Sequence, residues 1–339
     1  MGTMRVGLVG YGGAGRGIHA RLVRSAGQQV THVVTSRRGE QVEQDWPTAV
    51  VVPDVDALLQ HVDDLDLVVV ASPSGDHAEH AIAALAAGAH VLVDKPLATT
   101  TADAQRLVDA ADGRLTVFQN RRWDPEQLAL AGLLAGGALG DVHRFERRWE
   151  RFRPQPMDRW KENDVEAGGL LLDLGAHLVD SAVQLFGPAR TVYAELRSLT
   201  TPAPDDVFLA LTHEGGVVSH LQAGAVVGAP GPRTRVLGRT AAYLVTSYEG
   251  EPTPFAALDD AYEESRRPGE PEHEGWLVTG AERVPVPRPR GGHQDIYPAL
   301  ARWALEGGAV PVDPADAVAT AHVLDAARRS AEEGVVVTL

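Results

Sequence analysis

The chain contains no cysteine among its 339 residues. Disulfide bridges, thiolate zinc sites and a cysteine nucleophile are therefore excluded, and any metal would need histidine or carboxylate ligands. The chain also lacks the run of about 20 apolar residues that a bilayer-spanning helix needs, and it has no basic and then apolar leader at its amino end. These absences predict a cytoplasmic protein without a membrane anchor.

Positive charge is scarce, because 31 Lys and Arg residues stand against 46 Asp and Glu residues, for a formal net charge of −15. Such a chain repels nucleic-acid phosphates and anionic membrane surfaces, so neither is an expected partner. The hydrophobic fraction of 44% and the charged fraction of 23% are typical of a globular chain with a sizeable core. The length exceeds what one core usually organises, which predicts two domains.

The first third of the sequence alternates short Val-rich runs with helical stretches. The runs include RVGLVG, LDLVVVA and HVLVD. Apolar runs without strict alternation indicate strands that are buried on both faces, as in a parallel sheet covered by helices on each side. Residues 1–121 are therefore predicted to form a doubly wound α/β domain.

The remainder changes to alternating patterns that favour strands with one solvated face, such as VHRFERRWERFRP and DVFLALTH. Residues 122–339 are predicted to form an α+β domain with a large, mostly antiparallel sheet, which binds substrate and forms oligomers. Helices are expected at 125–136, 294–306 and 314–332, the last packing back on the first domain. A stretch rich in Pro, Glu and Gly at 250–274 is expected to be a long exposed excursion between strands.

A glycine motif of the form G-x-G-x-x-G, the segment GYGGAG, lies directly after the first strand and before a helix. In that position the glycines allow a tight turn, close approach of a pyrophosphate and close packing of the helix, whose amino end attracts anions. The alternative is a glycine-rich turn without a ligand. The motif predicts a dinucleotide-binding Rossmann domain with contacts from Gly10, Gly12, Gly13, Ala14 and Gly15.

The second strand ends in Thr35, Ser36, Arg37 and Arg38, where an NAD enzyme would place an acid against the ribose hydroxyls. A serine hydroxyl and a guanidinium can instead bind a 2′-phosphate, so we expect NADP as the cofactor, with NAD as the alternative. Both arginines could also be solvated surface residues, and Glu40 lies close to them in sequence.

Candidate catalytic residues stand at two places. Lys95 follows the strand HVLVD, and the carboxyl ends of parallel strands are where open α/β sheets bind ligands. Pro96 fixes the chain direction after it. Asp173 and His177 are four residues apart in GGLLLDLGAH, which puts them on one face of a helix. Asp173 and His177 could alternatively be two ligands of a metal site, or a pair with a capping and packing role. No third metal ligand is identifiable nearby in the sequence, so no metal is predicted.

The glycine motif, the Lys-Pro pair and GGLLLDLGAH together resemble the Gfo/Idh/MocA family of nicotinamide-dependent sugar and cyclitol oxidoreductases. The resemblance covers nearly the whole chain, including the stretch from ASPSGDHAEH to VLVDKPLA and the tail PVDPADAVATAHVLDAARRSAEEG. QNRRWDP and ERFRP further resemble the branch with NADP-dependent scyllo-inositol dehydrogenases. Two positions depart from the family pattern: Asp94 stands where Glu is usual before Lys-Pro, and Ser74 where Asn is common.

This resemblance implies a catalytic triad of Lys95, Asp173 and His177. These residue types suit the reaction, because oxidising a secondary alcohol needs a base for the hydroxyl proton, and histidine has an ordinary pKa of about 6.5. The reaction also benefits from a cation that stabilises the alkoxide. Further cofactor contacts are predicted at Ser72, Pro73, His77, Asp94, Lys95 and Pro96. Substrate contacts are predicted at Lys95, Arg122, Trp123, Arg153, Trp160, Asp173 and His177.

The sequence thus predicts an NADP- or NAD-dependent dehydrogenase that acts on a cyclic polyol or sugar, with another ketosugar as a substrate alternative. A sensor of the same fold that binds a dinucleotide without chemistry is a different class, and retention of the triad argues against it. A sheet face that must be covered predicts a homodimer or homotetramer.

Overall fold

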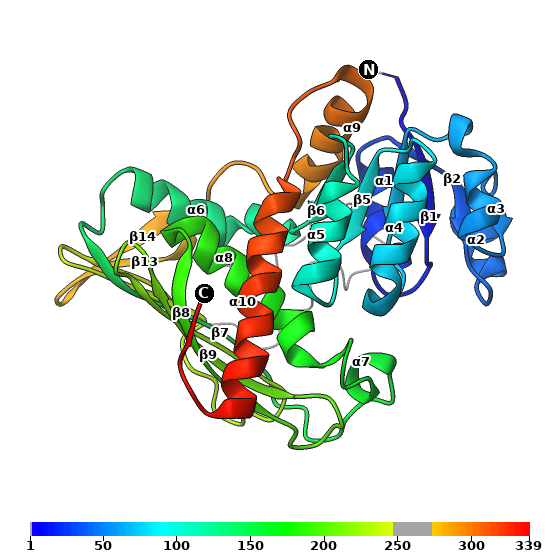
Figure 1. Cartoon of the computed structure of the whole chain (residues 1–339). Helices are drawn as coiled ribbons and strands as arrows, with labels where there is room; N and C mark the ends of the chain where they lie inside the picture. Colours follow the sequence, from blue (N-terminus) through cyan, green and yellow to red (C-terminus); the bar gives the residue numbers. More distant parts are fainter. Residues whose placement is uncertain (1, 247–272) are drawn as a thin grey trace. The chain divides into compact units, whose positions relative to one another are not determined.

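The computed structural model describes residues 2–246 and 273–339 (Figure 1). Its described residues form two compact units, and neither unit is a single continuous segment. The first unit comprises residues 2–120 and 292–318, and the second comprises 121–246, 273–291 and 319–339. Most of the predicted excursion at 250–274 lies outside the described residues.

The first unit is built on a six-stranded parallel sheet in the order β3-β2-β1-β4-β5-β6. All four residues of β4 are buried, as the run of apolar residues without alternation predicts. The fold class predicted for this part is confirmed. The strands are β1 (Arg5–Val9), β2 (Gln29–Val34), β3 (Val50–Val52), β4 (Leu67–Val70), β5 (Val91–Asp94) and β6 (Leu115–Phe118).

Helices connect these strands, and the last helix of the unit comes from a distant part of the chain (Figure 1). The first connection starts with one turn of π-helix at Gly15–His19. The helix Gly39–Asp45 and the edge strand after it are short elements that the sequence patterns did not indicate. The α-helices are α1 (Ala20–Ser25), α2 (Gly39–Asp45), α3 (Val55–Leu59), α4 (His77–Ala86), α5 (Thr101–Asp109) and α9 (Ile296–Glu306).

The segment 292–318, which is distant in sequence, contacts the sheet through hydrogen bonds of one buried hydroxyl. Thr116, on the edge strand β6, donates from Oγ1 to the carbonyl oxygen of Val312 at 2.8 Å and accepts from the amide of Val312 at 3.2 Å. Both residues are buried. Because a buried backbone amide and carbonyl need partners, this exchange completes the edge of the sheet.

The second unit contains a nine-stranded sheet in the order β14-β13-β12-β11-β7-β10-β9-β8-β15. Its described neighbours pair antiparallel except β7 and β10, which are parallel. The predicted mostly antiparallel sheet is therefore confirmed. The strands are β7 (Val142–Glu150), β8 (Ala189–Arg197), β9 (Asp206–His213), β10 (Val218–Gly224), β11 (Thr234–Gly238), β12 (Ala242–Val245), β13 (His273–Thr279), β14 (Glu282–Pro287) and β15 (Val337–Thr338).

One face of this sheet is covered by the helices α6 (Pro125–Ala135), α8 (Ala176–Phe186) and α10 (Pro314–Glu333) (Figure 1). The core between them includes Leu130, Leu178, Leu209 and Leu324. Along β9 buried residues alternate with half-buried ones, so the opposite face of the strand keeps part of its surface accessible. Residues 319–333 of α10 belong to the second unit, and its core includes Val323, Leu324, Ala326 and Ala327 of this helix.

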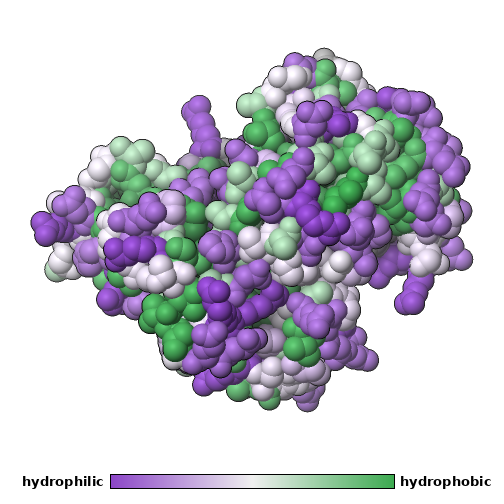
Figure 2. Space-filling view, in the orientation of Figure 1, coloured by the Kyte–Doolittle hydropathy of each residue, from purple (hydrophilic) through white to green (hydrophobic). Residues whose placement is uncertain are grey.

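The visible surface mixes hydrophilic and hydrophobic residues, with the hydrophilic ones spread widely (Figure 2). Such a mixture is ordinary for a folded protein surface. In the part of the chain that the structure describes, no helix combines the length and the apolar character that crossing a bilayer requires.

Candidate active site

The glycine-rich turn after β1 has the geometry that its spacing predicts. Gly10 has a φ of +95°, in the left-handed region, and a Cβ there would come within 2.7 Å of the carbonyl oxygen of Ala71. A Cβ on Gly15 would lie 2.0 Å from the carbonyl oxygen of Gly10. Gly10 therefore allows the turn, and Gly15 allows the following helix to pack closely against it.

Gly12 and Gly13 differ from these two because a Cβ on either would meet no atom within 4 Å. Helical hydrogen bonding starts here, since the amides of Arg16 and Gly17 donate to the carbonyl oxygens of Gly12 and Gly13 at 2.9 and 3.0 Å. A backbone surface free of side chains at the start of a helix fits the pyrophosphate of a dinucleotide. The residues of this turn therefore fit the predicted cofactor.

An acidic residue that sequence reasoning did not single out lies beside the turn. Asp45, at the end of α2, accepts hydrogen bonds from the Tyr11 hydroxyl at 2.8 Å and from Arg16 Nε at 2.6 Å. The hydrogen bond from Arg16 is the largest effect that lowers the pKa of Asp45 below its ordinary value. The three residues connect the glycine turn to a helix that lay outside the predicted elements.

The residues predicted to select NADP, which are Ser36, Arg37 and Arg38, are exposed and follow the end of β2. The guanidinium of Arg38 donates to Gln41 Oε1 at 3.4 Å. No carboxylate pairs with either arginine side chain among the residues described, so both cations face solvent. This placement at the end of the second strand is the one that the NADP prediction assumes.

Lys95 directly follows β5 at the carboxyl end of the parallel sheet, and a cis peptide bond joins it to Pro96. The side chain of Asp94 accepts a hydrogen bond from the Lys95 amide at 2.8 Å. The carboxylate of Asp94 therefore contacts the lysine through its backbone.

His77 joins two turns that are both predicted to contact the cofactor. Its ring is 1% exposed, with Nδ1 2.8 Å from the carbonyl oxygen of Pro96 and Nε2 2.9 Å from that of Ser72. A neutral imidazole carries only one N–H and donates to one of these carbonyl oxygens, whereas the imidazolium donates to both. Burial lowers the pKa of His77, whereas Asp94 and the two carbonyl oxygens oppose this effect. Both ring nitrogens thus contact the protein's own backbone.

A second buried histidine, which the sequence did not reveal, lies behind the lysine turn. His19 Nδ1 is 2.9 Å from the hydroxyl of Tyr297, and His19 Nε2 is 3.9 Å from Asp94 Oδ2. The imidazole also contacts Phe118, with ring centroids 4.3 Å apart. Full burial lowers the pKa of His19 to about 4, so this ring is neutral at neutral pH.

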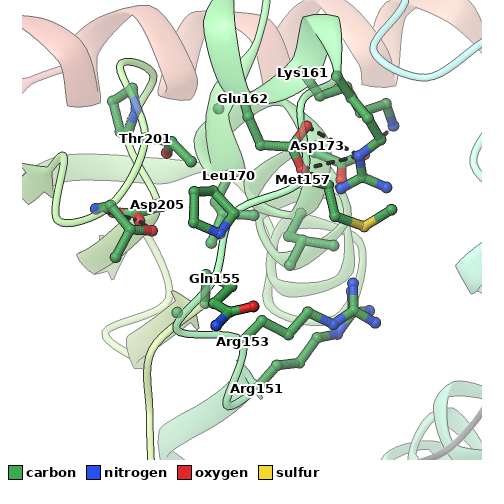
Figure 3. A pocket seen from close by; sticks show the side chains of 18 residues that line it. Arg151, Arg153, Gln155, Met157, Lys161, Glu162, Leu170, Asp173, Thr201 and Asp205 are labelled. Carbon is green, nitrogen blue, oxygen red and sulfur yellow. Dashed lines mark hydrogen bonds and ion pairs between the residues drawn. The ribbon is translucent and has the colours of Figure 1, made fainter.

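In the second unit, Asp173 lies on one turn of π-helix, Leu171–Gly175, that leads into α8. Its carboxylate is 2.6 Å from Nζ of Lys161, on the short helix α7 (Trp160–Asn163), and both side chains line a pocket (Figure 3). Single π-turns recur at functional sites in helices. Sequence reasoning did not single out Lys161 as the partner of this aspartate.

His177 follows one turn later on α8 and is 6% exposed. Its ring meets Trp149 edge-on, with centroids 5.5 Å apart, and the guanidinium of Arg121 lies over the same tryptophan at 5.0 Å. Of the residues predicted to bind substrate in this unit, Asp173 and Arg153 line the pocket, whereas His177 is packed beside Trp149.

Three further predicted substrate residues have different surroundings. Arg122 makes a two-pronged ion pair with the buried Asp180, with distances of 3.0 and 2.6 Å from Nε and Nη2. Trp123 is half-buried in the same 3₁₀ turn, Asn120–Trp123. Trp160 is 38% exposed at the start of α7. Asp180 was not predicted, because its partner lies 58 residues away in the sequence.

Among the residues that the structure describes, no group of three His, Cys, Asp or Glu side chains could hold a metal ion. A parallel sheet whose glycine turn fits a pyrophosphate defines a protein with a dinucleotide-binding domain, and the second unit adds a pocket lined by several charged side chains.

Comparison with known proteins identifies the family. Residues 4–120 match the model described as "Oxidoreductase family, NAD-binding Rossmann fold", and residues 128–244 match the Gfo/Idh/MocA C-terminal domain. The chain is 31% identical to the scyllo-inositol 2-dehydrogenase (NADP(+)) IolW of Bacillus subtilis, over 98% of this chain and 94% of that protein. The protein therefore belongs to the Gfo/Idh/MocA family and is an oxidoreductase, as predicted.

Two other relatives support the same conclusion. The inositol 2-dehydrogenase of Acidothermus cellulolyticus is 39% identical over 54% of this chain and 55% of its own length. The solved structure of the oxidoreductase YvaA of Bacillus subtilis superimposes with a TM-score of 0.87 at 30% identity, over 100% of this chain and 99% of that one. The likeness therefore extends over both units.

Proposed function

We propose that the protein transfers a hydride between NADP and a secondary alcohol or ketone of a cyclic polyol or sugar, with an inositol as the first substrate to test. One observation carries the proposal: in a chain of this family, Asp173 lines a pocket that contains several charged side chains, and it lies one helical turn before the buried His177. A relative named for scyllo-inositol and NADP supports the choice of substrate and cofactor.

In this proposal Lys95, Asp173 and His177 are the catalytic residues. The nicotinamide cofactor supplies the hydride acceptor when it is bound. His177 takes the hydroxyl proton, a role that suits an imidazole near neutral pH. Lys95 stabilises the developing alkoxide, and a positioned cation of this kind contributes about 3 kcal/mol to the transition state. Asp173 accepts a hydrogen bond from a neighbouring hydroxyl or from a lysine, and its carboxylate contacts Lys161.

The remaining site residues divide between cofactor and substrate. We assign the pyrophosphate to the glycine turn and the 2′-phosphate to Ser36, Arg37 and Arg38. The turns that contain Ser72, Pro73, Asp94 and Pro96 hold the nicotinamide half, with His77 joining them from behind. Contacts with the substrate are proposed for Arg122, Trp123, Arg153 and Trp160.

The function is tested by following the absorbance of reduced nicotinamide while the protein meets inositols and aldoses with NADP and NAD in turn. We expect turnover of at least one polyol. His177→Asn should lower kcat by about 100-fold or more, since general-base catalysis contributes at least that much, while the Kd for NADPH stays within about threefold. Equal loss of turnover and of NADPH binding would reject His177 as the base. Silence with every substrate, in a protein that still binds NADPH, would favour the sensor class.

Cofactor choice has its own test. Arg37→Gln combined with Arg38→Gln should raise the Kd for NADPH about 10-fold or more and leave NADH binding nearly unchanged, because only NADPH carries the 2′-phosphate. Fluorescence titration of both cofactors measures this. Equal weakening of the two would show that these arginines do not read the phosphate.

We also propose that the protein forms a homodimer or homotetramer in the cytoplasm. The accessible face of the nine-stranded sheet supports the oligomer, because burying such a face against a second copy is a common solution. The location in the cytoplasm stays a prediction from the sequence.

A further inference from the structure

The pocket of the second unit has an unusual balance of charge for so acidic a chain. Four cationic side chains line it, from Arg151, Arg153, Arg159 and Lys161. Three carboxylates line it as well, from Glu162, Asp173 and Asp205. In a protein with a net charge of −15, a pocket with more cations than carboxylates indicates a local requirement.

Each of the three carboxylates already has partners within the unit. Both oxygens of Glu162 accept from Arg159 Nε at 3.0 Å. Asp173 is 2.6 Å from Lys161. Asp205 is held by its own loop, because it accepts from the amides of Leu199 and Thr200 at 2.6 and 2.9 Å and from the Thr200 hydroxyl at 2.6 Å.

Arg151 and Arg153 are the two cationic residues of the pocket lining that do not pair with one of these three carboxylates. Neither guanidinium makes a hydrogen bond or an ion pair with any residue in the described ranges, 2–246 and 273–339. Figure 3 shows the two side chains extending side by side, with their charged ends together. Two like charges in this arrangement repel each other unless an anion lies between them.

The backbone holds the two arginines in this arrangement. The amide of Arg151 donates to the carbonyl oxygen of Gly224 at 2.9 Å, the amide of Arg153 donates to that of Ala225 at 2.6 Å, and Phe152 pairs with Val226 as an isolated antiparallel bridge. Residues two apart on such an extended segment point to the same side. The pair of guanidinium groups is therefore built by strand pairing.

The charges around Arg153 favour the addition of an anion. Burial is the main cause that lowers the pKa of Arg153, and the neighbouring charges of Arg151 and Arg159 lower it further, against the opposing effect of Glu162. Guanidinium groups match carboxylates and phosphates in geometry, because each presents parallel N–H donors to two oxygens.

We propose that Arg151 and Arg153 form a subsite for an anionic group on the substrate, so that the preferred substrate is a polyol or sugar that carries a carboxylate or a phosphate. This inference rests on the proposed function and makes its substrate class narrower. A neutral inositol would leave both guanidinium groups without an anion. An acidic relative of the same ring would neutralise them.

Matched pairs of compounds test the subsite. The value of kcat/KM is measured for glucose against glucuronate and glucose 6-phosphate, and for myo-inositol against myo-inositol 1-phosphate. We expect the charged member of at least one pair to react at least 10-fold better. In the Arg151→Gln, Arg153→Gln double variant the ratio of charged to neutral kcat/KM should fall about 100-fold, because two charge-assisted hydrogen bonds are lost.

A matched control removes two positive charges elsewhere in the unit. Arg144 is exposed on β7, and Arg239 is 79% exposed. The Arg144→Gln, Arg239→Gln double variant should keep the preference of the wild-type protein. An equal loss of preference in this control would mean that general attraction of anions, rather than the subsite, produces it.

Other outcomes separate this inference from the proposed function. Turnover of neutral polyols with no preference for charged ones overturns the subsite and leaves the proposed function standing. A double variant that raises KM for NADP and keeps the substrate preference places the cofactor's phosphate at these arginines, which also overturns the subsite. Titration calorimetry with glucuronate and myo-inositol 1-phosphate gives a readout without turnover. Binding that does not depend on the two arginines, or no binding, overturns the proposal.

Discussion

His19 places a titratable ring in a fully buried position, directly behind the turn that carries the predicted catalytic lysine. Its burial is complete, and its pKa of about 4 lies below the value of about 6.5 for an exposed histidine. Between these two values the unfolded chain binds a proton that the folded chain excludes. The stability contributed by the neutral ring is therefore lost as the pH falls from about 6.5 toward 4.

This difference predicts that lowering the pH from 7.5 to 5.0 costs about 2 kcal/mol of unfolding free energy through His19 alone. In urea titrations the His19→Asn variant, whose amide can still meet the Tyr297 hydroxyl, should lose about 2 kcal/mol less than the wild type over this range. His143→Asn, at an exposed position, serves as the control and should change nothing. An unchanged pH dependence in His19→Asn would mean that the ring is protonated in the fold.

Residues whose role depends on local chain geometry could be predicted from the sequence. Gly10 and Gly15 have the close approaches that the motif requires. The position of Lys95 at a strand end could be predicted because the strand before it is recognisable in the sequence. Lys161 and His19 could not be predicted, because their roles come from partners that only the tertiary fold brings near, 12 and 278 residues away. For Lys95 and His177 the catalytic assignment itself stays a prediction.

At the scale of the element, different glycines of the turn after β1 are expected to matter for NADPH binding and for the stability of the fold. Gly12→Ala adds a methyl group to open space, so the melting temperature should stay within about 2 °C while the Kd for NADPH rises about 10-fold or more, because the methyl group occupies the surface offered to the pyrophosphate. Thermal unfolding and fluorescence titration measure the two effects. Unchanged NADPH binding would show that the pyrophosphate does not lie on Gly12.

Gly15→Ala is the matched variant in the same turn. Its new methyl group would lie 2.0 Å from the Gly10 carbonyl oxygen, so the helix must move, at a cost of about 1–3 kcal/mol. We expect a clear fall in melting temperature without bound cofactor. Equal melting temperatures for Gly12→Ala and Gly15→Ala would show that Gly15 is not closely packed against the Gly10 carbonyl oxygen.

Elements with strong patterns were predictable and short ones were not. The buried Val-rich strands and the alternating strands of the large sheet carry their periodicity in the sequence. The strand Val50–Val52 has only three residues, two of them exposed, which is too few for a period to be recognised. The π-turns at Gly15–His19 and Leu171–Gly175 have no sequence signature of their own, because a helical pattern does not distinguish 3.6 residues per turn from a wider turn.

For the whole molecule, the accessible face of the nine-stranded sheet predicts self-association. Light scattering coupled to size exclusion should give two or four times the chain mass of 36.1 kDa. Ala210→Arg, at a half-buried position in the middle of β9, should shift the mass toward 36.1 kDa with unchanged circular dichroism, because it places an unpaired charge in the interface. A wild-type mass of 36.1 kDa would exclude the oligomer.

The attachment of Val312 to Thr116 and of Tyr297 to His19 has a consequence for how the protein is made. Both contacts join the first unit to residues that a ribosome adds much later, 196 residues after Thr116 and 278 residues after His19. Until then the Thr116 hydroxyl on the edge strand β6 lacks its hydrogen bonds with Val312, and His19 lacks its contact with Tyr297. Most of the second unit, including residues 121–246 and 273–291, is translated before residues 292–318 complete the first. The first unit is thus completed after most of the second, and a nascent chain stopped before residue 292 carries an unfinished cofactor domain.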